Sequence, residues 1–164
     1  PEMKNYVGEE EIIDIKEELL QISPTIFDNY DAKRKMGDND SYICTLIRQD
    51  LVEEFISYAN RTNISLSSQI KPSIFETNPF LIENQNTSLI EYSAFFGSIQ
   101  IFRFLLMNNV ELKSSLWIYA IHSKNGELIH LLESNKVCPP IIENNSNKND
   151  NYLECYIESI KCHQ

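Results

Sequence analysis

Residues 88–112 read SLIEYSAFFGSIQIFRFLLMNNVEL and contain two short helical patterns on either side of a glycine. Ala94 is a small residue where two helices can touch, and Gly97 supplies the turn between them. The second pattern has apolar residues at helical spacing and ends at Asn108-Asn109. Asn109 can adopt the left-handed conformation that usually falls to a glycine after a helix. The stretch therefore predicts two helices joined by a tight turn.

The same order of residue types returns elsewhere in the chain. Residues 114–133 hold a second copy, in which Ser123 takes the place of Gly97. A weaker copy occupies residues 41–60, and residues 152–163 match the first helix alone. Repetition of a helix pair predicts a solenoid of stacked units. We expect the final half repeat either to be capped in another way or to continue in a longer protein.

Residues 88–112 resemble an ankyrin repeat, whose pattern is Thr-Pro-Leu-His, two alanines, a glycine and a closing leucine pair. Three further segments, SYIC (41–44), IFETNPF (74–80) and LWIYAIH (116–122), resemble an ankyrin-repeat-like family of unknown function that is expanded in unicellular eukaryotes. The resemblance covers most of residues 20–164. It implies an ankyrin-like fold, and for partners it implies only that such folds usually bind proteins. The positions that carry the ankyrin match are Ser88, Ile90, Ser93, Ala94, Gly97, Leu105 and Leu106.

The spacing departs from that of ordinary ankyrin repeats, which return about every 33 residues. The equivalent positions Ile47, Ala94, Ala120 and Ile160 lie 47, 26 and 40 residues apart. The longest step holds an insertion at residues 66–83, which contains two prolines and several apolar residues. We therefore expect an irregular stack without the usual groove lined by β-turn fingers.

The fold class predicted is all-α: an irregular ankyrin-like helical solenoid preceded by an N-terminal helical pair. Residues 1–40 form that pair and pack on the solenoid, with a first helix over residues 9–22 and a second that ends at Gly37. Residues 41–164 form about three ankyrin-like helix pairs plus a half repeat.

Composition excludes several classes of function. The 164 residues carry 14 Lys+Arg against 24 Asp+Glu, a net charge of −10, which opposes binding to nucleic acid or to anionic membranes. Only 4 glycines are present, and none forms the phosphate-binding loop of a nucleotide site. No apolar run has the roughly 18 residues of a membrane span, and no secretory signal is visible. We expect an intracellular protein, cytoplasmic rather than nuclear.

No motif of catalysis or metal binding is evident. The two mid-chain histidines, His122 and His130, lack the partners of a known catalytic motif. The cysteines are scattered, so reduced core thiols are the preferred interpretation. We therefore predict no enzyme activity, no cofactor, no metal and no small-molecule substrate. The residues weighed as zinc ligands, without a suitable spacing, are Cys138, Cys155, Cys162 and His163.

A row of variable residues is the best candidate for a contact surface. In ankyrin-type repeats the two residues before the turn glycine lie outside the shared core. Here they are Arg48-Gln49, Phe95-Phe96, Ile121-His122 and Lys161-Cys162, and stacking would align them. Together with Trp117 they would form an exposed patch that captures a partner. The alternative is that the 66–83 insertion covers them.

The predicted function is a non-catalytic protein–protein interaction module, a scaffold or adaptor that binds another protein. The alternative is a terminal structural or regulatory segment of a longer protein, which caps a neighbouring domain. The residues proposed to contact the partner are Gln49, Glu91, Phe96, Trp117 and His122.

Overall fold

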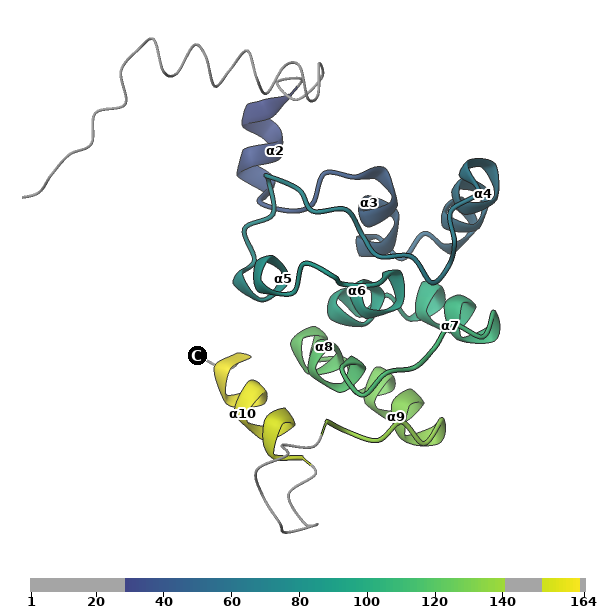
Figure 1. The fold of residues 1–164 in the computed structure, drawn as a ribbon. Coiled ribbons are helices and arrows are strands. Elements are labelled where there is room, and N and C mark those ends of the chain that lie inside the picture. The colour runs from purple at the N-terminus through teal and green to yellow at the C-terminus, as the bar shows by residue number, and fades with distance from the viewer. Residues whose placement is uncertain (1–28, 141–151, 163–164) are drawn as a thin grey trace, which may run out of the picture.

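The structure is a computed structural model, and it describes residues 29–140 and 152–162 (Figure 1). These residues form helices and no strand, which confirms the all-α prediction. The helix expected over residues 9–22 lies outside the described residues. The helices are α2 (Tyr30–Met36), α3 (Tyr42–Arg48), α4 (Val52–Thr62), α5 (Pro79–Glu83), α6 (Leu89–Phe96), α7 (Ile99–Met107), α8 (Leu116–Ser123), α9 (Gly126–Ser134) and α10 (Leu153–Cys162).

The helices pack in antiparallel pairs that follow one another along the chain (Figure 1). The pairs are α3 with α4, α6 with α7, and α8 with α9, while α10 has no following helix among the described residues. Helices α3, α6, α8 and α10 contact one another in that order, and α4 contacts α7 beside them. The first helix of each pair therefore belongs to one continuous layer.

Helix α6 lies at the centre of this layer, and its sequence explains its place. Seven of its eight residues are buried, so it is apolar nearly all round, as expected for a helix enclosed by neighbours. Ser88 and Glu91 form a capping box at its start. Gly97 ends it with a φ of 73°, in the left-handed region that glycine adopts without strain.

The turns inside and between the pairs use the same backbone device. Asn109 has a φ of 58°, which confirms the left-handed conformation predicted for it. In the next pair the left-handed residue is Lys124, with a φ of 55°, and Ser123 is the last residue of α8. Matching Ser123 to Gly97 was therefore wrong by one position, because α8 continues through Ser123 before the chain turns.

The insertion at residues 66–83 joins several parts of the fold. The backbone N–H of Ile70 donates to Thr87 O at 2.9 Å, and that of Thr77 donates to Gly37 O at 2.9 Å, at the end of α2. The segment then forms α5, which begins at Asn78, whose side chain accepts hydrogen bonds from two backbone N–H groups of the helix. Phe80 of α5 stacks on Phe95 of α6 at a centroid distance of 5.7 Å. The insertion thus links α2 to α6.

The core extends through all the pairs. Among its fully buried members are Tyr92, Phe55 and Phe102 from α6, α4 and α7, with Leu116 and Leu128 from the following pair. Burial of such side chains contributes about 1.5–3 kcal/mol each. Across the described residues, helices with the length and apolarity of a membrane crossing are absent.

Candidate functional site

An open groove of about 840 Å³ lies among α5, α6, α8 and α10. We call it the aromatic groove, because three phenylalanines line it beside a histidine. Its volume falls in the range of about 300–1,000 Å³ that is common for binding sites. The lining residues are Asn78, Pro79, Phe80, Glu83, Asn84, Phe95, Phe96, His122, Ser123, Lys124, Glu158, Lys161 and Cys162.

The end of α6 supplies the apolar wall of the groove. Phe95 is buried under Phe80, whereas Phe96 is half-buried and has one side open. The Phe96 ring lies 4.7 Å from that of Tyr92 and 5.0 Å from that of Phe95. The guanidinium of Arg48 lies 5.9 Å from the Phe96 centroid, within cation–π range. Phe96 is therefore held in place by α3 and α6 while its open side faces the groove.

Arg48 is itself fixed by its neighbours. One guanidinium nitrogen, Nη1, donates to the carbonyl of Asn39 at 2.8 Å and to the Tyr92 hydroxyl at 2.9 Å. Nε lies 3.5 Å from the Asp38 carboxylate. Burial raises the pKa of Tyr92, so its hydroxyl keeps its proton and accepts from Arg48.

Next to these rings lies a polar cluster of His122, Glu158 and Cys162, which we call the His122 cluster. Nε2 of His122 lies 2.9 Å from Glu158 Oε1, and Nδ1 lies 3.4 Å from Cys162 Sγ. Lys161 donates to the other carboxylate oxygen of Glu158 at 2.9 Å. Glu158 and Cys162 are four residues apart on α10, so they share one helical face toward α8.

The protonation states of the cluster follow from its surroundings. Burial lowers the pKa of His122, although Glu158 acts to raise it. The lowered pKa favours the neutral imidazole. Burial acts to raise the pKa of Glu158, but hydrogen bonds from Lys161 and His122 outweigh it and the pKa is lowered. Burial and the Glu158 charge raise the pKa of Cys162, so the thiol stays protonated.

A thiol, an imidazole and a carboxylate in contact with one another could serve either nucleophilic catalysis or metal binding. A cysteine nucleophile needs a thiolate, and burial together with the Glu158 charge disfavours that form of Cys162 by raising its pKa. A metal ion can displace the thiol proton itself. One ligand atom from each of the three residues lies within 4.8 Å of the others. The described residues of the cluster could therefore hold a metal ion.

Of the five residues predicted to contact a partner, the structure brings Phe96 and His122 together in the aromatic groove. The ring of Phe95 connects them, at 5.0 Å from each. Gln49 is exposed at the end of α3 and does not line the groove.

Glu91 and Trp117 lie in the interior, so predicting them as partner contacts, and Trp117 on an exposed patch, was wrong. Glu91 is 8% exposed, accepts from the Ser88 backbone N–H at 2.8 Å and accepts from the Ser115 hydroxyl at 2.6 Å. Trp117 is 4% exposed, and its Nε1 donates to the carbonyl of Val137 at 2.9 Å. Both side chains point toward neighbouring segments, where they join α6 to the start of α8 and α8 to the chain after α9.

The sequence interpretation missed Phe80 and Glu158. The ring of Phe80 lies 4.2 Å from that of His122, so the insertion covers part of the predicted row, as the alternative held. No sequence pattern indicated which residue of the insertion would cover the row. Glu158 did carry a signal, because a Glu four residues before Cys162 shares a helical face with it.

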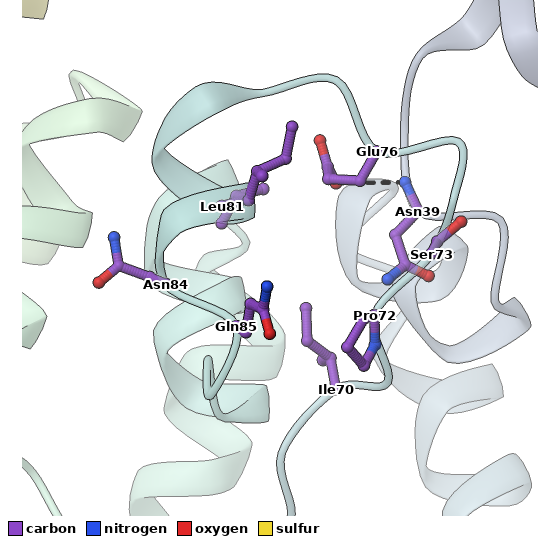
Figure 2. A pocket seen from close by; sticks show the side chains of 9 residues that line it. Asn39, Ile70, Pro72, Ser73, Glu76, Leu81, Asn84 and Gln85 are labelled. Atoms are coloured by element: carbon purple, nitrogen blue, oxygen red, sulfur yellow. Dashed lines mark hydrogen bonds between the residues drawn. The ribbon is translucent and has the colours of Figure 1, made fainter.

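A second, smaller pocket of about 110 Å³ lies between the insertion and the start of α3 (Figure 2). Its polar groups bind one another: the Asn39 backbone N–H donates to Glu76 Oε2 at 3.3 Å, and Asn39 Nδ2 donates to Lys71 O at 2.7 Å. These bonds hold the insertion against the chain that precedes α3. The pocket is smaller than usual ligand sites, so we assign it a packing role.

No protein-family model, curated protein or solved structure matches this chain.

Proposed function

We propose that this chain is a non-catalytic protein-interaction module of ankyrin-like helix pairs, which binds another protein in the aromatic groove. The observation that carries the proposal is the half-buried Phe96, which contacts Arg48, Tyr92 and Phe95 and also lines the groove. A rigid aromatic side chain in a recess is the usual anchor of a protein interface.

The order of helix contacts supports the ankyrin-like part of the proposal. Each first helix contacts the first helix of the next unit, as in stacked repeats. Neighbouring units are also tied by polar bonds: Ser98 donates its hydroxyl proton to Ile47 O, and Asp50 accepts from backbone N–H groups of α7. We also propose an intracellular location, because the exposed thiol of Cys138 suits a reducing compartment.

The charged residues on the rim of the groove indicate which charge the partner segment carries. Lys124 and Lys161 are exposed beside the phenylalanines, and Glu83 lies across from them. We expect a partner segment that inserts an apolar side chain against Phe96 and places an acidic group near the lysines. Rim charges of this kind chiefly guide association and orientation.

The test begins with capture of a partner from lysate and continues with the purified partner. Two lysines provide a matched pair, because Lys124 and Lys136 both follow a helix and both have a φ of 55°. Lys124→Glu alters the groove, whereas Lys136→Glu makes the same change outside it. We expect Lys124→Glu and Phe96→Ala each to weaken binding by roughly tenfold or more, as for interface anchors, and Lys136→Glu to bind as the parent does.

Equal effects of the two lysine changes, or a folded Phe96→Ala variant with parental affinity, would contradict the groove as the binding surface. Failure of the parent to retain any partner would contradict the interaction-module proposal itself. Circular dichroism establishes that each variant is folded.

One observation favours the alternative, a structural segment that caps a neighbouring domain. The outer face of α10 exposes Tyr156 by 64%, Ile157 by 43% and Ile160 by 44%. In a longer chain, packing of a neighbour on this face would protect the α10 amides from hydrogen exchange. Ile157→Ser/Ile160→Ser would remove that protection while leaving binding in the groove intact.

A further inference from the structure

We propose that His122, Glu158 and Cys162 bind one divalent transition-metal ion of the zinc class, which joins α8 to α10. The three side chains come from two helices, and one donor atom of each lies within 4.8 Å of the others. All three ligands belong to this chain and line the aromatic groove, so the ion can bind without a partner but lies on the proposed binding surface.

The kind of donor selects the kind of metal. The set contains an imidazole nitrogen, a carboxylate oxygen and a sulfur, which suits Zn²⁺ or Co²⁺. Ca²⁺ and Mg²⁺ require oxygen ligands and are disfavoured by the other two. Zinc lies about 2.0–2.3 Å from such ligands, so donor atoms around it are roughly 3–4 Å apart. One donor atom of each residue already lies within 4.8 Å of the others, so the three must approach one another by up to about 1–2 Å.

Binding requires a small rearrangement, because one imidazole nitrogen ligates while the other keeps a hydrogen bond. Glu158 and Cys162 line an open groove, which leaves their side chains room to turn toward a shared point. The metal–sulfur bond forms as the thiol releases its proton to solvent. The fourth tetrahedral position opens into the groove and is taken by water.

The hydrogen bonds of the cluster already orient the ligands, because His122 Nε2 faces Glu158 Oε1 and its Nδ1 faces Cys162 Sγ. The positive charge of Lys161 lies close to the site and opposes binding of a metal cation. Its hydrogen bond to Glu158 Oε2 also orients that carboxylate, so that Oε1 faces His122.

The test is a Co²⁺ titration of the reduced full chain followed by absorption spectroscopy. We expect one equivalent to bind, with the visible bands of tetrahedral Co²⁺ and a near-ultraviolet charge-transfer band from the cysteine sulfur. Zn²⁺ should displace Co²⁺ and remove both. Cys162→Ser should abolish the charge-transfer band, and His122→Gln should weaken binding on the order of 100-fold, at or above the loss caused by removing an outer-shell partner.

The chain offers matched controls for both changes. Cys138→Ser alters an exposed cysteine outside the cluster, and His130→Gln alters an exposed histidine on α9. Both variants should bind Co²⁺ as the parent does. Any of three results would overturn the proposal. The charge-transfer band could be absent from the parent, lost in Cys138→Ser, or retained in Cys162→Ser.

A second readout guards against loss of folding in the variants. Zn²⁺ should raise the melting temperature of the parent by mass action and leave that of Glu158→Gln nearly unchanged. An equal rise in both would overturn the assignment of Glu158.

Discussion

The carboxylate of Asp50 caps α7, a helix of the next helix pair. Its Oδ1 accepts from the Ile101 backbone N–H at 3.0 Å, and its Oδ2 accepts from that of Gln100 at 3.1 Å. The residue at the N-cap of α7, Ser98, makes no side-chain bond to its own helix, because its hydroxyl donates to Ile47 O. Neighbouring helix pairs have therefore exchanged capping groups, and their stability is coupled.

Asp50→Ala should lower the free energy of unfolding by about 1–2 kcal/mol, as expected for loss of a helix cap. Asp50→Asn should cost less, because its amide oxygen still accepts and asparagine tolerates the φ of 51° at this position. Urea unfolding measures both. If both variants lose the same free energy of unfolding, the hydrogen bonds of Asp50 to α7 contribute nothing beyond its negative charge.

Trp117→Ala should lower the free energy of unfolding by about 3–5 kcal/mol, since it removes a large buried side chain and a hydrogen bond to Val137. The matched control is Met107→Ala, at an exposed residue, which should stay within about 0.5 kcal/mol of the parent. A small effect of Trp117→Ala would place this side chain on the surface after all.

Gly97→Ala and Gly126→Ala should have opposite effects. Gly97 has a φ of 73°, so alanine is strained there by about 1–2 kcal/mol, although the added Cβ would meet Ser123 at an ordinary 3.5 Å. Gly126 begins α9 with no atom within 4 Å of an added Cβ, so alanine should be neutral or stabilising by up to about 1 kcal/mol. Thermal unfolding of the pair checks the prediction, and equal shifts would contradict it.

Acid should destabilise the contact between α2 and the insertion through Asp40. Burial acts to raise the pKa of this carboxyl, but bonds from Ser73 at 2.7 Å and Lys33 at 3.1 Å outweigh it and lower the pKa. The folded protein therefore binds the proton less well than the unfolded chain does. The resulting stability is present above the ordinary pKa of about 3.9 and is lost as the pH falls through the lower folded value.

Asp40→Asn should consequently flatten the dependence of the free energy of unfolding on pH below about 4. Urea titrations at several pH values measure it. The control Glu111→Gln, an exposed carboxylate in the loop after α7, should leave the slope as in the parent. An unchanged slope in Asp40→Asn would contradict the prediction.

The local features of the fold could be predicted from the sequence because they depend on neighbouring residues. The turn at Gly97, the left-handed Asn109 and the helical character of α10 all follow from short patterns. Phe96 and His122 line the same groove, but the ring of Phe95 lies between them, and with the match at Gly97 corrected by one position the counterpart of Phe96 is Ser123.

The burial of Trp117, the position of Phe80 and the His122 cluster depend on long-range contacts that no short sequence pattern encodes. Trp117 was placed outside by analogy with a regular repeat, yet the chain near Val137, in the 40-residue step after Ala120, covers it. Phe80 reaches His122 from the insertion, whose path is set by distant bonds such as that of Thr77 to Gly37. The His122 cluster joins residues 36 and 40 positions apart, beyond the range of any motif.

The insertion also changes how this molecule should unfold. In a linear array each unit contacts only its neighbours, so the ends can open while the middle stays intact. Here the insertion hydrogen-bonds to Gly37 beside α2 through Thr77. Its Phe80 ring also packs against Phe95 in α6 and against Tyr119 and His122 in α8. Opening α2, α6 or α8 alone breaks contacts with the same segment. The three helices should therefore exchange their amide hydrogens as one cooperative unit, with α4 and α9 free to open separately.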